Sequence, residues 1–143
     1  MILAACVEVG APQIRTRGTV AGNLVTASPA NDTITALYVL DAEVELASAA
    51  GRRRMSVEAF CTGFRSTALA PGELVRSISV RKLGASRRGI FLKLGLRKAQ
   101  AISVISVAVV VEFDGPRVTG ARIALGCVAP TIVRVRDAEA RTV

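Results

Sequence analysis

A stretch of small and polar residues near the N-terminus has the composition of a loop that approaches a phosphate group closely. Residues 19–23 read Thr-Val-Ala-Gly-Asn, and Asp32 follows at the expected start of a helix. Small side chains let backbone N–H groups reach a diphosphate, a helix N-terminus adds partial positive charge, and an acidic side chain suits ribose or ribityl hydroxyls. A surface turn followed by a capped helix explains the same pattern, because short glycine-containing loops are common.

The composition excludes several kinds of site. The 143-residue chain has no histidine, and its cysteines, Cys6, Cys61 and Cys127, are isolated. His-based triads and HExxH zinc sites are therefore absent, and zinc ribbons or iron–sulfur clusters lack their thiolates. We assign no catalytic residue and no metal ligand, and we interpret the cysteines as small buried hydrophobic residues. Isolated cysteines are typical of a reducing compartment, so we expect a cytoplasmic protein without a membrane span.

The first half of the chain predicts a mixture of helices and antiparallel strands. We expect a helix to end near Val9, a loop over residues 13–25, and a helix with Ser28 as N-cap and Pro29 in its first turn. Period-two alternation over residues 41–47 predicts a strand with Ala42, Val44 and Leu46 facing inward. Further strands are expected over residues 53–57 and 74–80, the last with Leu74, Ile78 and Val80 on one side.

The second half predicts a β-sheet. Residues 84–89 are typical of a linker or an exposed loop, and residues 90–97 alternate between apolar positions and a second face that holds Phe91 and Lys93. Residues 102–113 and 117–127 predict a hairpin around the Asp-Gly-Pro turn. A short helix is expected after Pro130. The whole chain is therefore assigned to the α+β class.

Several segments, in order along the chain, resemble the FAD-binding (medium) subunit of molybdenum hydroxylases, the flavoprotein family of xanthine dehydrogenase and aerobic carbon monoxide dehydrogenase. They are VGAPQIRTRGTVAGNLVTASPANDT, LDAEVELAS, APGELVRSISV, FLKLGLRKAQAISVISVAV and ARIALGCVAPT. The resemblance implies a second FAD-binding subdomain of antiparallel strands with flanking helices, over residues 1–83. It implies that residues 84–143 are the β-sheet part of a C-terminal flavoprotein domain. It also implies an FAD subdomain upstream and further helices after Val143, so we expect a fragment.

The resemblance assigns FAD contacts to individual positions. The residues that match the family's cofactor-binding positions are Thr19, Val20, Ala21, Gly22, Asn23, Asp32, Val75 and Lys93. A cation such as Lys93 near a flavin would stabilise negative charge, whereas the same residue on an exposed strand would be an ordinary solvated lysine. Ala21 departs from the family pattern, which has glycine there; a methyl group restricts positive φ and adds bulk near the ligand.

The resemblance implies an oxidoreductase in which electrons pass from a molybdopterin centre through iron–sulfur clusters to FAD, and then to NAD or another acceptor. It places the molybdopterin on a large partner subunit and the clusters on a small one. The redox chemistry would belong to the cofactor.

Two other hypotheses remain open at the level of sequence. All of the net charge of +8 lies in residues 81–143, and seven cations fall between Arg81 and Lys98. This charge would suit a non-enzymatic basic module that binds nucleic acid or a scaffold. The low aromatic content of 3% and the absence of a nucleic-acid motif argue against nucleic acid. The third hypothesis is a degenerate remnant that folds but no longer binds FAD.

Overall fold

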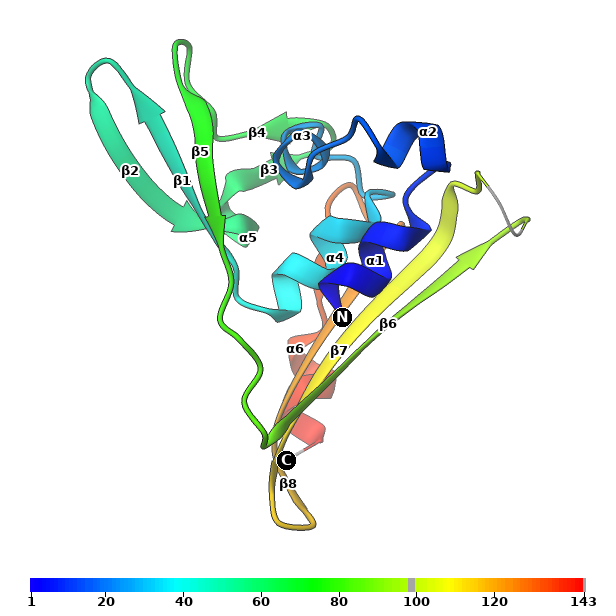
Figure 1. The fold of residues 1–143 in the computed structure, drawn as a ribbon. Coiled ribbons are helices and arrows are strands. Elements are labelled where there is room, and N and C mark those ends of the chain that lie inside the picture. The colour runs from blue at the N-terminus through cyan, green and yellow to red at the C-terminus, as the bar shows by residue number, and fades with distance from the viewer. Residues whose placement is uncertain (98–99, 143) are drawn as a thin grey trace.

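Helix α4 (Asp32–Val39) lies at the centre of the structure, and all eight of its residues are buried. This computed structural model describes residues 1–97 and 100–142. Helix α4 is packed between α1 (Ile2–Glu8) on one side and strands of the larger sheet on the other (Figure 1). Its burial on every side explains why threonines alternate with apolar residues there: Thr33 and Thr35 both have hydrogen-bond partners inside the protein.

Two short helices occupy the segment that the sequence predicts as a loop, so that prediction is wrong. Helix α2 (Pro12–Arg15) begins with a proline in its first turn, and α3 (Val20–Val25) is capped by Thr19. The Thr19 hydroxyl accepts a hydrogen bond from the Gly22 N–H at 2.9 Å. Ala21 lies within α3 and has no positive φ, so a methyl group is tolerated there.

The central helix begins later than the sequence predicts. Its N-cap is Asn31 rather than Ser28, and the first helical residue is Asp32. Ser28 instead forms a turn, in which its carbonyl accepts a hydrogen bond from the Asn31 N–H at 3.0 Å. The Ser-Pro sequence supplies turn geometry equally well, which is why the boundary shifts by one helical turn.

A small antiparallel sheet follows α4, with its strands in the order β2-β1-β5. Its strands are β1 (Glu43–Ser48), β2 (Gly51–Ser56) and β5 (Leu74–Ser79), and α5 (Val57–Phe60), β3 (Cys61–Gly63) and β4 (Ser66–Thr67) lie between β2 and β5. The predicted inward residues of β1 are confirmed as buried.

The predicted facing of β5 is wrong. Leu74 is 60% exposed and Val80 is 41% exposed, while Val75 and Ile78 pack against the core. The pairing of β1 with β5 shifts register between Glu45 and Leu46, and such an irregularity exchanges the two faces of a strand.

The second half forms a four-stranded antiparallel sheet in the order β6-β7-β8-β9. Its elements are β6 (Arg87–Gly95), β7 (Ser103–Asp114), β8 (Arg117–Gly126), β9 (Val133–Arg134) and the final helix α6 (Arg136–Arg141). The predicted hairpin and terminal helix are confirmed. The predicted exposed loop is only partly right, because β6 already begins at Arg87.

The alternation along β6 is confirmed, and its apolar face is the exposed one. Phe91 is only 8% exposed, whereas Ile90, Leu92 and Leu94 are each more than half exposed. Leu92 is paired across the sheet with Val107, on the face away from α4. The face of β6 that contributes to the core is therefore the one that carries Phe91 and Lys93.

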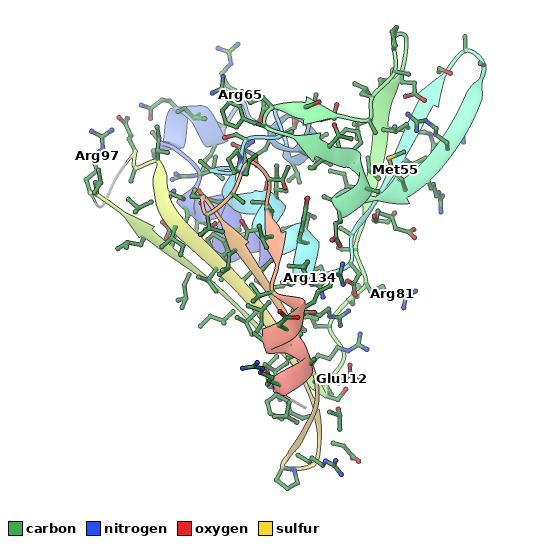
Figure 2. All side chains as sticks on the ribbon, turned by 180° about the vertical axis from the view of Figure 1, so that it is seen from behind. Met55, Arg65, Arg81, Arg97, Glu112 and Arg134 are labelled. Carbon is green, nitrogen blue, oxygen red and sulfur yellow. The ribbon has the colours of Figure 1, made fainter. Side chains whose placement is uncertain are left out.

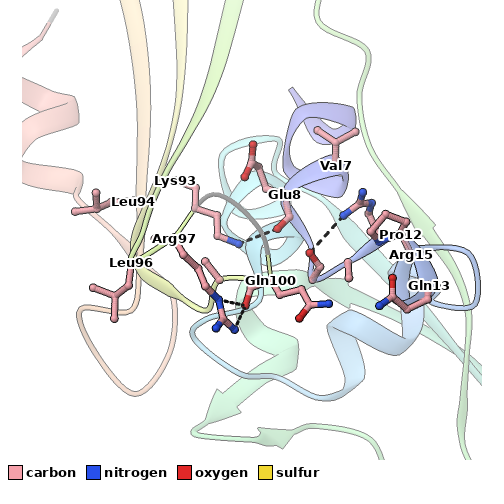
Figure 3. A pocket seen from close by; sticks show the side chains of 14 residues that line it. Val7, Glu8, Pro12, Gln13, Arg15, Lys93, Leu94, Leu96, Arg97 and Gln100 are labelled. Atoms are coloured by element: carbon pink, nitrogen blue, oxygen red, sulfur yellow. Dashed lines mark hydrogen bonds between the residues drawn. The ribbon is translucent and has the colours of Figure 1, made fainter.

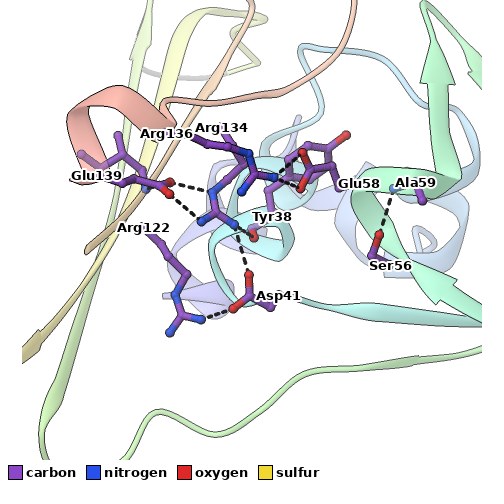
Figure 4. Close-up of polar contacts among 10 residues, drawn as sticks. Tyr38, Asp41, Ser56, Glu58, Ala59, Arg122, Arg134, Arg136 and Glu139 are labelled. Carbon is purple, nitrogen blue, oxygen red and sulfur yellow. Dashed lines mark hydrogen bonds and ion pairs between the residues drawn. The ribbon is translucent and has the colours of Figure 1, made fainter. Parts of the chain in front are cut away.

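A network of charged residues joins α4 to the C-terminal end of the chain (Figure 4). The guanidinium of Arg134 donates to Glu139 at 2.7 Å, to Asp41 at 3.1 Å and to the Tyr38 carbonyl at 3.2 Å. Asp41 also pairs with Arg122. Figure 2 shows Arg134, which belongs to β9, beside the final helix. No helix in the described part of the chain has the length and apolar character that a membrane crossing requires.

Candidate functional site

Three adjoining cavities share lining residues, and we call them together the groove. We name them the Thr19 cavity (about 530 Å³), the Asp32 cavity (about 910 Å³) and the Lys93 cavity (about 970 Å³). The Thr19 and Asp32 cavities share Asn23 in their walls, and the Asp32 and Lys93 cavities share Arg97.

The Thr19 cavity brings together four of the predicted binding residues. Thr19, Val20, Gly22 and Asn23 all line it, whereas Ala21 does not. Thr19 and Val20 are placed by the start of α3, and the missing side chain of Gly22 leaves room for the hydroxyl that caps the helix. A Cβ atom at position 22 would lie 3.0 Å from Thr19 Oγ1.

Cations and a thiol complete the wall of the Thr19 cavity. Arg15 and Arg17 line it beside the apolar residues, so an anionic group would find positive charge at its rim. Cys6 also lines it, and burial raises the pKa of the Cys6 thiol. The thiol therefore stays protonated at neutral pH and acts as a small apolar wall residue.

Asn23 connects the first two cavities. Its side-chain oxygen accepts a hydrogen bond from the Thr33 hydroxyl, and its carbonyl accepts one from the Asn31 side chain at 2.7 Å. These contacts fix the end of α3 against the start of α4. Asn23 and Asp32 therefore line the same cavity although nine positions separate them.

Asp32 and Lys93 form a buried ion pair. Lys93 Nζ lies 2.8 Å from Asp32 Oδ2, and the two side chains are 6% and 4% exposed. The same ammonium donates to the Glu8 carbonyl at 2.8 Å (Figure 3). The other carboxylate oxygen of Asp32 accepts a hydrogen bond from the Ser103 hydroxyl at 2.6 Å. The structure thus brings these two predicted residues into direct contact, and Ser103 is a partner that the sequence analysis missed.

Val75 lies apart from the groove. It sits on β5, half-buried against the core, and β5 packs against α3. Val75 lines none of the three cavities, so the structure does not bring its predicted cofactor contact together with the other site residues.

The basic segment from Arg81 to Lys98 does not form one open patch. Arg87 pairs with Glu112 at 3.0 Å, Lys93 is buried, and Arg97 donates to the Gln100 carbonyl at 2.8 Å. Arg97 and Arg65 instead line the Asp32 cavity, and both lie at the same end of the molecule in Figure 2. Lys98 lies outside the described residues.

Across residues 1–97 and 100–142, no group of three potential ligands is placed to hold a metal ion.

The fold consists of a first half with helices and a small sheet and a second half built on a larger sheet, and the Asp32 and Lys93 cavities are lined by residues of both halves. Comparison with known proteins assigns this arrangement to a flavoprotein family. The family described as FAD binding domain in molybdopterin dehydrogenase matches residues 2–82, and the CO dehydrogenase flavoprotein C-terminal domain matches residues 90–143. The chain belongs to this family of molybdopterin dehydrogenase flavoproteins.

Two curated relatives illustrate the similarity. The chain is 38% identical to the nicotinate dehydrogenase FAD-subunit of Eubacterium barkeri, over 92% of this chain and 46% of the relative. It is 32% identical to the carbon monoxide dehydrogenase medium chain of Hydrogenophaga pseudoflava, over 91% and 45%. The chain thus spans about half the length of these relatives.

Solved structures show the same fold. Carbon monoxide dehydrogenase from Hydrogenophaga pseudoflava superposes with a TM-score of 0.90 at 32% identity, covering 95% of this chain and 47% of that one. Quinoline 2-oxidoreductase from Pseudomonas putida 86 gives 0.89 at 27% identity, covering 98% and 48%. The resemblance and the fold class expected from the sequence are confirmed.

Proposed function

We propose that the groove forms one side of an FAD site and that the chain is the FAD-binding part of a molybdenum hydroxylase-type oxidoreductase. The observation that carries this proposal is spatial. Six of the eight residues predicted from the sequence line one continuous groove, although they come from α3, α4 and β6. Family membership supports the choice of FAD over other anionic nucleotides.

The chemistry of the groove fits parts of such a nucleotide. The Thr19 cavity offers apolar surface together with threonine and asparagine side chains, and its rim carries Arg15 and Arg17. Apolar walls suit an aromatic ring system, and arginines suit a diphosphate. We assign the cofactor contacts to Thr19, Val20, Gly22 and Asn23, with Lys93 at the far end of the groove; Asp32 acts beside Lys93, and Ala21 and Val75 remain predicted contacts.

When bound, FAD would supply the redox chemistry, because flavins accept and donate electrons in a way that no side chain does. The chain's own residues bind and orient the cofactor, and none is required as a general acid or base. We further propose that electrons arrive from iron–sulfur clusters on a small partner subunit, fed by a molybdopterin-binding large subunit. NAD or another acceptor would then remove them.

We also keep the division into residues 1–83 and 84–143, and the cytoplasmic location, as proposals. The two family matches, to residues 2–82 and 90–143, support the division. Limited proteolysis would test it, with cleavage expected between residues 83 and 88.

The test of the proposed function is the visible absorbance of flavin in the native complex that carries this chain. We expect FAD to copurify and to be released by denaturation. A complex with its subunits intact, with Gly22 and Asp32 unchanged, and without flavin would overturn the proposal. Such a result would favour the degenerate remnant instead, which isothermal titration with added FAD would then establish.

The basic binding module is not favoured. Two of its seven cations, Arg87 and Lys93, are paired with carboxylates. Both family matches favour an FAD-binding subunit over a module that binds a phosphate backbone. A steep loss of DNA affinity with salt, combined with a real sequence preference, would revive this alternative.

A further inference from the structure

The carboxylate of Asp32 is held by donors from the second sheet. Oδ2 accepts from Lys93 on β6 at 2.8 Å, and Oδ1 accepts from Ser103 at the start of β7 at 2.6 Å. With the Asp32 side chain only 4% exposed, its charge is balanced by these two contacts rather than by solvent.

A local irregularity in the sheet places Ser103 in this position. Ser106, Ala108 and Val110 face α4 from β7 at the usual spacing of two, and Ser103 would point the other way if this spacing continued. The pairing of β6 with β7 shifts register between Leu94 and Gly95. Because of this shift Ser103 faces inward, and it is only 6% exposed. The shift therefore turns the Ser103 hydroxyl toward Asp32.

Lys93 keeps a donor for a ligand. An ammonium has three N–H groups, and among the residues that the structure describes its acceptors are Asp32 and the Glu8 carbonyl. The side chain lines the Lys93 cavity, so the remaining N–H is available to an oxygen atom in the groove. The direction in which this N–H points depends on the position of the Asp32 carboxylate, which accepts a hydrogen bond from the same ammonium.

We propose that Ser103 is a positioning residue, which fixes Asp32 and through it aims the Lys93 ammonium at the flavin nucleotide of the proposed function. This inference rests on the proposed function for its ligand and on the hydrogen bonds above for its mechanism. Ser103 itself acts only through Asp32.

The experiment compares Ser103→Ala with Ser106→Ala in the native complex. Ser106 is a matched control, because its hydroxyl also bonds a buried α4 side chain, that of Thr35 at 3.0 Å, without contact to Asp32. The first measurement is acylation of lysine amines by acetic anhydride after removal of flavin, quantified by mass spectrometry, with exposed Lys82 as internal reference. The second is the dissociation constant of FAD, and Ser103→Thr tests rescue by a hydroxyl.

We expect Ser103→Ala to raise the acylation of Lys93 several-fold. It should weaken FAD binding by about tenfold, because the displaced ammonium loses its own hydrogen bond to the nucleotide. Ser106→Ala should change neither, and Ser103→Thr should restore both. Unchanged Lys93 acylation in Ser103→Ala would overturn the proposal, as would an equal loss of FAD affinity in both alanine variants. If the unmodified complex binds no FAD, the proposed function fails, while the acylation result still decides the coupling between Ser103 and Lys93.

Discussion

Asp32 and Lys93 are 61 positions apart in the sequence, yet their side chains meet at 2.8 Å inside the protein. One belongs to the first turn of α4 and the other to β6, so the pair joins the helical half to the larger sheet. Burying two charges is costly unless each satisfies the other, and further hydrogen bonds are needed to complete the balance. The Ser103 and Glu8 contacts supply them.

Replacing Lys93 by methionine should destabilise the fold strongly, because Asp32 would keep a buried charge without its cation. We expect the free energy of unfolding in urea to fall by about 3–5 kcal/mol. The double variant Lys93→Met with Asp32→Asn should lose less than Lys93→Met alone, since no charge is then left unpaired. Strictly additive losses in this cycle would show that the two residues do not interact energetically.

Gly22→Ala should affect ligand binding more than stability. The added methyl group would lie 3.0 Å from Thr19 Oγ1, and disturbing this helix cap should lower the free energy of unfolding by at most about 1 kcal/mol. The higher helix propensity of alanine should raise it by a similar amount. The same methyl group narrows the Thr19 cavity, where overpacking of about 1–3 kcal/mol would weaken FAD binding by about 5- to 150-fold. Urea unfolding and a flavin titration measure the two effects. A loss of several kcal/mol in stability with unchanged FAD affinity would make Gly22 a purely structural glycine.

Periodic patterns in this sequence predict elements better than they predict faces or boundaries. The strands around Val44 and Leu92 follow from alternation alone. The facing of β5 and the burial of Ser103 do not, because both depend on register shifts that only neighbouring strands determine. The sequence analysis missed helix α3, because the small residues and the glycine of this segment are typical of a loop.

In the candidate site, too, the sequence predicts the local features but not the tertiary contacts. The local cluster over residues 19–23 can be found from its composition and its resemblance to a family. The contact of Asp32 with Lys93 is tertiary, and no spacing rule connects residues on a helix and on a distant strand. A serine at the edge of a β-branched run is a weak hint that Ser103 has a buried polar partner.

The two faces of β6 should respond differently to truncation. Phe91 is 8% exposed and packs in the core, so Phe91→Ala should cost about 3–5 kcal/mol. Leu92 is 57% exposed, so Leu92→Ala should cost well under about 1 kcal/mol in the isolated chain. Thermal or urea unfolding compares them. A large loss for Leu92→Ala would mean that this face is covered in solution.

Acid should weaken the contact between β2 and the turn before β5. Arg53 Nε donates to Glu73 at 2.7 Å, the Glu73 carboxylate also accepts from the Ala70 N–H, and these bonds lower the pKa of Glu73 to about 2. Because the folded pKa is depressed, this carboxylate stabilises the fold above its unfolded pKa of about 4.5, and the contribution is lost as the pH falls toward 2. Glu73→Gln should therefore flatten the dependence of unfolding free energy on pH across that window. A slope identical to that of the unmodified protein would contradict this assignment.

The network around Arg134 should contribute far more to stability than the neighbouring ion pair of Arg136. The Arg134 side chain is 7% exposed and its partner Glu139 is 12% exposed, whereas the pair of Arg136 with Glu58 is 63% and 46% exposed. Removing one member of a buried pair leaves an uncompensated charge, so Arg134→Met should lower the free energy of unfolding by about 3 kcal/mol.

Arg136→Met is the matched control, because Arg136 lies two positions after Arg134, at the start of α6, and the substitution is the same. It should cost between about 0 and 1 kcal/mol, because solvent already screens that pair. Raising the salt concentration should reduce the Arg136 effect further and leave most of the Arg134 effect in place, since buried pairs are poorly screened. Equal losses for the two variants would show that Arg134 contributes only as another surface charge. The difference between the two losses in unfolding free energy therefore measures how much the Arg134 contacts stabilise the packing of β9 and α6 on α4. These contacts include the hydrogen bond that Arg134 donates to the Tyr38 carbonyl.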